Sequence, residues 1–184
     1  MSVTLVSGVT GVGLSTVCQT LRRKLGDGYK LVNFGDVMLE QAATRGLATE
    51  RGELATLSQR ETRRLQRRAG EFVADEAENT NVILSTHLAV EIQSGYIQGL
   101  PNEVLHDVSP TTFALVEASP ETILERRRSG SRETQEATER KIDFEQDLNR
   151  SAALQCARDQ NAPVRFIENE GSVEEAAERL VNTL

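Results

Sequence analysis

The sequence of 184 residues carries 21 lysines and arginines against 28 aspartates and glutamates, which gives a formal net charge of −7. This length suits a single domain over residues 1–184 with one sizeable core. The apolar fraction of 38% and charged fraction of 27% exclude global disorder and a fibrous repeat. The negative charge argues against a protein that coats DNA or adheres to anionic membranes.

No apolar run approaches the ~20 residues that a membrane span needs, and a predicted strand begins within two residues of Met1. We therefore predict no membrane segment, no signal peptide and a cytoplasmic protein. Cys18 and Cys156 lie far apart within helical patterns, which favours two buried thiols over a disulfide or a metal pair.

The N-terminal segment predicts a buried strand that runs into a phosphate-binding loop. Residues 3–6 are apolar and mostly β-branched, as in a strand covered on both faces. The Walker A spacing follows, with leucine in place of its lysine, over Gly8-Val9-Thr10-Gly11-Val12-Gly13-Leu14-Ser15-Thr16. Glycines let backbone amides turn toward a phosphate, and the start of the next helix adds further donors. We predict nucleotide phosphate binding here rather than a packing turn, with the Ser15 hydroxyl helping to hold Mg²⁺.

Strand and helix patterns then alternate. Residues 15–25 predict a helix that two glycines end, residues 30–34 a second strand, and the segment to about residue 46 another helix. Residues 58–78 predict a long helix with Leu65, Ala69, Phe72 and Val73 on one side.

A third apolar strand at residues 81–84 places Ser85, Thr86 and His87 at its carboxyl end, where parallel sheets bind ligands. For His87, a nucleotide contact and a hydrogen-bonded structural role both stay open. Residues 94–101 are punctuated by glycine and proline and predict a loop, which a short helix to Asp107 follows.

The C-terminal part predicts a strand at 112–118, a helix opened by Ser119 and Pro120, a long helix to about residue 160, a strand at 164–168 and a helix at 173–184. We interpret the polar segment at about residues 129–137 as a short lid, and residues 168–171 as a plain turn. The alternation predicts an α/β protein of the P-loop kinase fold, with a five-stranded, mostly parallel sheet and helices on both faces.

Four segments taken together resemble the archaeal-type adenylate kinases. They are the phosphate loop, Asn33-Phe34-Gly35-Asp36-Val37-Met38, Thr86-His87, and Ser94-Gly95-Tyr96-Ile97-Gln98-Gly99-Leu100-Pro101. The resemblance runs from Val3 to the final helix. It implies a cytoplasmic enzyme, usually a homotrimer, that moves a phosphoryl group reversibly between ATP and AMP with Mg²⁺.

The resemblance also implies roles for individual residues. The segment Gly8–Thr16 would hold the ATP phosphates, and Arg132 and Arg150 would be catalytic arginines of the lid and of the helix beside it. The AMP side would be formed by Gly35, Asp36, Met38, Thr86 and His87.

Five positions depart from the charged residues of the family pattern. Besides Leu14, they are Ala55 for an arginine, Ser85 for an aspartate, Glu91 for an arginine or lysine, and Thr134 for a second lid arginine. Because loss of one transition-state arginine costs roughly a thousandfold or more in phosphoryl transfer, we expect a slow or inactive adenylate kinase. Arg126, Arg127 and Arg128 are candidate substitutes.

The alternative function is a catalytically degenerate family member that binds nucleotide and acts as a sensor, scaffold or RNA-associated protein. A basic stripe on the predicted helix at 58–78 bears on this alternative: Arg60, Arg63, Arg64, Arg67 and Arg68. A solvated helix face paired with glutamates is the favoured interpretation, and contact with an RNA backbone is the other.

Overall fold

The computed structural model describes residues 1–92, 94–130 and 137–184. Its elements in chain order are β1 (Val3–Ser7), α1 (Leu14–Leu25), a 3₁₀ turn (Gly26–Gly28), β2 (Tyr29–Asn33), α2 (Phe34–Ala43), α3 (Arg51–Leu54), α4 (Gln59–Asn79), β3 (Asn81–Thr86), β4 (Ala89–Ile92), β5 (Gly95–Gln98), α5 (Asn102–Val108), β6 (Thr112–Glu117), α6 (Pro120–Ser129), α7 (Glu139–Gln160), β7 (Val164–Glu168) and α8 (Val173–Val181).

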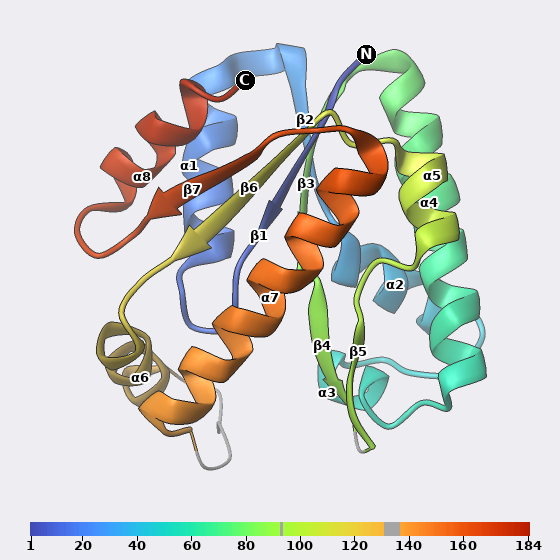
Figure 1. Cartoon of the computed structure of the whole chain (residues 1–184). Helices are drawn as coiled ribbons and strands as arrows, with labels where there is room; N and C mark the ends of the chain where they lie inside the picture. Colours follow the sequence, from blue (N-terminus) through green and yellow to red (C-terminus); the bar gives the residue numbers. More distant parts are fainter. Residues whose placement is uncertain (93, 131–136) are drawn as a thin grey trace.

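Five parallel strands form the main sheet in the order β2-β3-β1-β6-β7 (Figure 1). The predicted α/β architecture is therefore confirmed. All five residues of the central strand β1 are buried, as expected for a strand covered on both faces. Ser7 pairs in register with Thr86 of β3, so the two strands end together at the edge where the phosphate loop begins.

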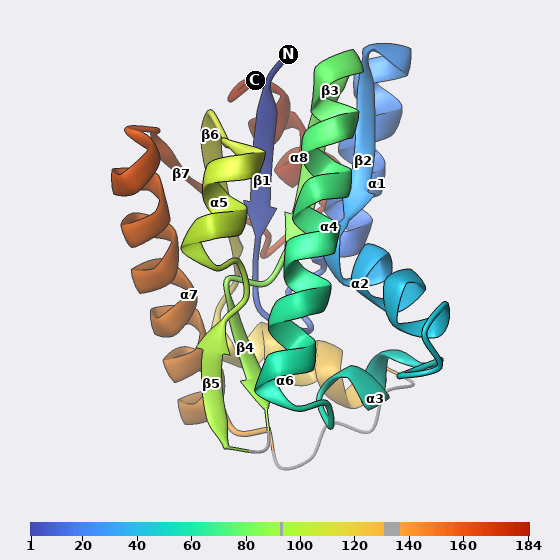
Figure 2. The same cartoon turned by 90° about the vertical axis from the view of Figure 1, so that its right-hand side faces the viewer.

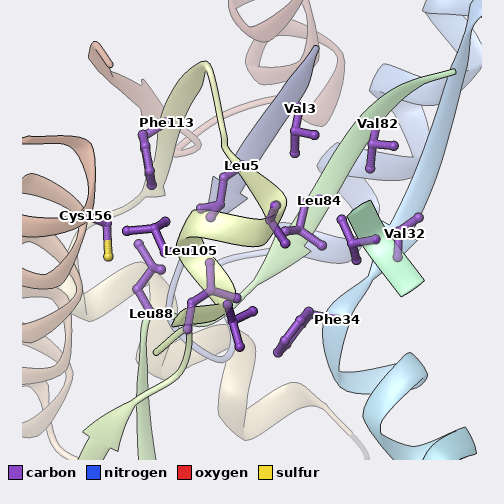
Figure 3. Packing of buried hydrophobic residues seen from close by; sticks show 14 of the residues in the cluster. Val3, Leu5, Val32, Phe34, Val82, Leu84, Leu88, Leu105, Phe113 and Cys156 are labelled. Carbon is purple, nitrogen blue, oxygen red and sulfur yellow. The ribbon is translucent and has the colours of Figure 1, made fainter. Parts of the chain in front are cut away.

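Helices cover both faces of the sheet, and each face has its own apolar cluster (Figures 1 and 2). Residues of α4, α5 and α7 pack with Leu5 and Phe113 on one face. Figure 3 shows Leu5 and Phe113 in this cluster together with Phe34, Leu84 and Cys156. Residues of α1, α6 and α8 pack with Val6 on the other face. Adjacent strand residues thus serve opposite clusters, as the alternation of side chains along a strand requires.

The local predictions needed three corrections. Phe34 starts α2 instead of ending a strand, because the Asn33 side chain caps this helix by accepting from the Asp36 amide at 3.2 Å. The predicted loop at 94–101 contains β5, which pairs with β4 in an antiparallel hairpin. Phe72 is 36% exposed, whereas Leu65, Ala69 and Val73 of α4 are buried.

Several predictions concern features outside the sheet. Cys18 and Cys156 are free and buried, as predicted, and burial raises the pKa of the Cys18 thiol to about 12. Most of the lid proposed at 129–137, including Arg132 and Thr134, lies outside the described residues. Across the described ranges, no helix combines the length and the apolar character needed to cross a membrane.

The basic stripe of α4 faces solvent. All five of its arginines are exposed. Within the described part of the chain, one of them has an ion pair with a glutamate, at 3.7 Å between Arg67 Nε and Glu71 Oε1. The exposure of the five arginines fits the favoured interpretation of a solvated face. Of the expected ion pairs with glutamates, the described residues show the one made by Arg67.

Candidate nucleotide-binding site

The phosphate loop joins β1 to α1 in a backbone shape that needs glycine. Gly11 has a φ of +86° and Gly13 a φ of +89°, both in the left-handed region that side chains disfavour. Gly13 is also the N-cap of α1 and supplies no side-chain cap to the first amides of the helix. Amides at an uncapped helix start, together with the helix dipole, are suited to bind an anion such as a nucleotide phosphate.

Side chains from distant elements hold the carbonyl groups of this loop. The Val12 carbonyl accepts from Asn169 Nδ2 at 2.7 Å and from Arg126 Nη1 at 3.2 Å. The Thr10 carbonyl accepts from Arg127 Nε at 2.8 Å. His87 Nδ1 lies 2.5 Å from the Gly8 carbonyl oxygen. These bonds fix the carbonyls and thereby preorganise the loop before a ligand arrives.

A buried ion pair supports the same loop. Arg127 Nη2 lies 2.6 Å from Glu145 Oε2, and the two side chains are 6% and 14% exposed. A Cβ at Gly11 would come within 2.7 Å of Arg127 Cγ, so close packing adds a second requirement for glycine there. Tyr96 donates to Glu145 Oε1 at 3.3 Å, and burial together with the charge of Glu145 raises the pKa of Tyr96 to about 12.

A cavity of about 470 Å³ extends from the phosphate loop to α2, α3 and α4, and we call it the main cavity because most of the predicted site residues line it. This volume is in the usual range for small-molecule sites. Its apolar lining includes Met38 and Leu54 on one side and Val90 and Ile97 of the hairpin on the other. Within the described ranges, its lining contains two arginines, Arg51 and Arg126, and no lysine.

Leu14 lines this cavity where a Walker A loop has its lysine. Its side chain is 7% exposed and belongs to the cluster between α1 and the sheet. The leucine keeps the backbone amides of the loop in place, but it supplies no charge to a transferred phosphate.

A second cavity of about 460 Å³ adjoins the loop between α1 and β2. It is lined by Ser15, Cys18, Gln19, Leu31, Asn33, Asp36, Arg51 and Ser85. Ser15 and Arg51 line both cavities, so the two spaces meet there. In the part of the chain that the structure describes, no group of three or more His, Cys, Asp or Glu side chains forms a metal cage. The residues present fit a Mg²⁺ that takes a hydroxyl from Ser15 and its remaining ligands from phosphate oxygens and water.

The structure brings most of the predicted site residues together around these cavities. The main cavity is lined by Val9, Thr10, Gly11, Gly13, Leu14, Ser15, Thr16, Gly35, Met38, Thr86 and His87. Asp36 lines the second cavity, while Gly8 and Val12 are buried residues of the loop that line neither cavity.

Arg150 is placed differently from these residues. It lies on α7 and lines neither cavity. Its Nη2 donates to Glu117 Oε2 at 2.6 Å and its Nη1 to Asp147 Oδ1 at 2.7 Å. The hydrogen bonds to Glu117 raise the pKa of Arg150.

Several residues that shape the site were missed in the sequence. Asn169, which lies in the predicted plain turn, is buried and bonds the loop. Gln66 of α4 donates to the Gly99 carbonyl at 3.0 Å, and Asn149 of α7 accepts from Ser7 Oγ at 2.8 Å. A position at the carboxyl end of a strand was the available signal for Asn169, whereas a polar residue within a helix gave none for the other two.

Comparison with known proteins decides the family. A family model described as an AAA domain matches residues 7–143. Adenylate kinases from Thermococcus onnurineus and Methanopyrus kandleri are 36% and 38% identical to the chain, over 99% of it and over 94% and 97% of those relatives. The chain belongs to the adenylate kinase family. The resemblance noted in the sequence is therefore confirmed.

Solved structures support the fold of this adenylate kinase family member. A shikimate kinase from Bacteroides thetaiotaomicron superposes with a TM-score of 0.62 at 20% identity, covering 99% of this chain and 97% of that one. A gluconokinase from Sinorhizobium meliloti gives a TM-score of 0.54 at 14% identity, covering 99% and 94%. At these identities the likeness concerns the fold alone, and it confirms a P-loop kinase fold.

The departures from the adenylate kinase pattern can now be located. Leu14, Ala55 and Ser85 all line the main cavity, so the missing charges leave its wall largely neutral. Glu91 of the hairpin forms an ion pair with Lys141 of α7, with 2.9 Å between Glu91 Oε1 and Lys141 Nζ. A lysine is thus present beside the acidic replacement, on the neighbouring element. Thr134 is outside the described residues.

Proposed function

We propose that this chain is a cytoplasmic adenylate kinase that transfers a phosphoryl group reversibly between ATP and AMP with Mg²⁺. The observation that carries this proposal is the shape of the main cavity, which leads from the phosphate loop to a largely apolar wall of α2, α3 and α4. Such a cavity offers one end to the phosphates of a donor and the other to an acceptor nucleotide. The names of the relatives, which are adenylate kinases, support this pair of substrates.

In this proposal the two nucleotides divide the predicted residues between them. The amides of Gly8–Thr16 bind the ATP phosphates. Gly35, Asp36 and Met38 contact AMP from α2, and Thr86 and His87 contact it from the end of β3. Ser15 offers its hydroxyl to Mg²⁺, whose charge would neutralise the phosphates when it is bound.

The chemistry needs positioning and charge neutralisation rather than a covalent nucleophile. Arg126, which lines the main cavity beside the loop, contributes positive charge from the donor side. We assign Arg132 and Arg150 the same role at the transferred group. Arg150 would first exchange its bonds to Glu117 and Asp147 for phosphate oxygens.

An assay that couples ADP formation from ATP and AMP to a colour change tests the proposal, with binding of each nucleotide measured by calorimetry. We expect slow turnover and binding of both nucleotides. A matched negative control is Gly13→Ala, because a Cβ there would come within 2.8 Å of Asn169 Nδ2 at a φ of +89°. Binding without any turnover would favour the degenerate, nucleotide-sensing alternative.

We also propose that the chain forms a homo-oligomer, a trimer by family resemblance. Phe166 on the edge strand β7 is 64% exposed and Leu154 on α7 is 60% exposed, an amount of apolar surface that association would cover. Sedimentation velocity measures the state directly, and a sharp monomer boundary at high protein concentration would contradict it.

A further inference from the structure

The basic stripe of α4 occupies the whole exposed face of one half of this helix. From residue 60 to residue 70 every exposed position is an arginine, and these positions are Arg60, Arg63, Arg64, Arg67 and Arg68. Figure 2 shows α4 on the outside of the molecule. Because an α-helix rises about 1.5 Å per residue, the stripe extends for about 12 Å along the helix axis.

Most of these arginines have no carboxylate partner. Arg67 has the ion pair with Glu71. Hydrogen bonds from Ser58 and, to a smaller extent, the charge of Arg64 lower the pKa of Glu61. Across the ranges that the structure describes, the other three form no ion pair and no hydrogen bond through their side chains: Arg60, Arg63 and Arg68. Their guanidinium groups are therefore left for an external anion.

The order of charges along α4 opposes what would stabilise the helix. The exposed acidic residues of the helix all follow the stripe, at Glu71, Asp75 and Glu78. The helix dipole favours the reverse order, with acidic residues near the N-terminus and basic residues near the C-terminus. Arginines four positions apart also repel each other, as Arg60 and Arg64 do. Solvation explains why the stripe is exposed, but a face of mixed charges would be more stable, so the segregated charge points to binding.

An extended chain of phosphates is the anion that fits the stripe. Guanidinium groups bind phosphate through two parallel hydrogen bonds. A nucleic-acid strand carries one negative charge on every nucleotide, so a continuous row of cations meets a continuous row of anions. A membrane fits less well, because the apolar side of α4 is buried in the protein and cannot insert among lipids.

The charge of the remaining chain favours a single strand over a duplex. Five of the 21 lysines and arginines lie in the stripe, which leaves 16 elsewhere against 28 aspartates and glutamates. A rigid duplex that extended beyond the stripe would meet this negative surface and be repelled. A flexible single strand can follow the stripe and bend away from the protein at both ends.

We propose that the basic stripe of α4 binds the phosphate backbone of single-stranded RNA without reading its bases. RNA is the expected strand because proteins regularly meet it in single-stranded loops, bulges and ends. No aromatic side chain lies among the exposed positions from residue 60 to residue 70, so phosphate contacts carry the affinity and salt weakens it steeply. This inference goes beyond the proposed function and does not depend on it.

Fluorescence anisotropy with a labelled oligouridine of about 20 nucleotides tests the inference, in KCl from about 50 to about 200 mM. The test variant combines Arg60→Gln, Arg64→Gln and Arg68→Gln. Each lost phosphate contact lowers the slope of log K against log salt by about 0.7, so we expect a slope shallower by about 2 and a Kd at least about tenfold higher at the lowest salt. The thermal midpoint should not fall, because the substitutions remove repulsion between arginines.

The matched control has the same net charge and replaces three exposed arginines outside α4 with glutamine: Arg45, Arg158 and Arg165. Its Kd for oligouridine should stay within about threefold of the wild type, because the stripe is intact. Both variants should keep the wild-type rate of ADP formation, since none of these arginines lines the main or the second cavity.

Similar binding of oligothymidine would support contacts to phosphates rather than to bases or sugars. Three results would overturn the inference: no binding of oligouridine by the wild type at the lowest salt, an equal loss in both variants, or tighter binding of polyglutamate with the same number of charges. The last result would identify an acidic protein as the partner.

Discussion

Leu14 separates two properties that a phosphate loop usually combines. The glycine geometry and the uncapped start of α1 provide amides for binding a phosphate. Positive charge that stabilises the phosphoryl group during its transfer must come from elsewhere, because leucine supplies none. Binding and transfer are therefore expected to respond differently to substitutions at this position.

Restoring the lysine tests that separation. Because Leu14 borders the main cavity, Leu14→Lys can direct its ammonium toward the phosphates, and we expect kcat to rise at least about tenfold, since single transition-state donors are commonly worth 10²–10³. The Kd for ATP should change less than kcat. Leu14→Met is the control for size and flexibility, and it should leave kcat near the wild-type value. An unchanged kcat in a folded Leu14→Lys protein would show that the missing charge is already supplied.

Some residues that form or support the site can be predicted from the sequence, and others cannot. Gly11 and Gly13 could be recognised because their spacing within one short loop reports a required backbone shape. The contacts of Arg127 and Asn169 with this loop could not be recognised, although Arg127 was a candidate for another role. Each contact joins residues far apart in the sequence, 117 positions for Arg127 and 157 for Asn169, which come together only in the folded sheet. Arg51 was missed for a related reason: its importance comes from lining two cavities, which no local pattern reports.

At the scale of elements, the hairpin depends on one contact between backbones. A Cβ at Gly99 would lie 1.8 Å from the His87 carbonyl oxygen, and the Gly99 amide donates to the Leu88 carbonyl at 2.9 Å. Gly99→Ala therefore forces the end of β5 away from β3, and we expect it to lower the free energy of unfolding by more than about 4 kcal/mol. Urea denaturation followed by circular dichroism measures this.

The control for this substitution is Gly28→Ala, whose Cβ would meet no atom within 4 Å. It should change the stability by less than about 1 kcal/mol. If both substitutions cost the same, the close approach at Gly99 is not what sets the position of the hairpin.

The ion pair between Arg127 and Glu145 links α6 and α7 to the phosphate loop. Glu145→Leu leaves a buried arginine without its carboxylate, and we expect a loss of about 3–5 kcal/mol in the free energy of unfolding. Adding Arg127→Met should recover part of that loss. As a matched control, Lys141→Met breaks the exposed pair with Glu91 and should cost less than about 1 kcal/mol. Additive losses in the double variant would contradict a coupled pair.

Element prediction succeeded where burial imposes a simple pattern. The central strands β1, β3 and β6 are almost wholly buried because helices cover both of their faces, and all five strands of the main sheet were predicted to within a few residues. The hairpin of β4 and β5 was missed because its strands have four residues each and are mostly half-buried or exposed, which leaves no pattern distinct from a loop. Its position over the main cavity follows from tertiary contacts, such as the bond from Gln66 to Gly99.

At the scale of the whole molecule, the two apolar clusters share the strands that separate them. Leu5 belongs to one cluster and Val6 to the other, so loss of β1 removes support from both. A domain built in this way should unfold in one cooperative transition. The two cysteines report on it independently, because Cys18 belongs to one cluster and Cys156 to the other, and both are buried and free.

We therefore predict that both thiols become reactive over the same range of urea concentrations. In the folded protein Cys18 should label slowly, because burial holds its pKa at about 12 and the thiolate is the nucleophile. Mass spectrometry of the labelled peptides gives each midpoint separately. ATP at a hundred times its Kd should raise the free energy of unfolding by about 2.7 kcal/mol, since a ligand of the folded state stabilises the whole cooperative unit. The labelling of Cys18 and that of Cys156 should both report this same increase. Different midpoints, or a shift with ATP at Cys18 and none at Cys156, would mean that the two faces of the sheet unfold separately.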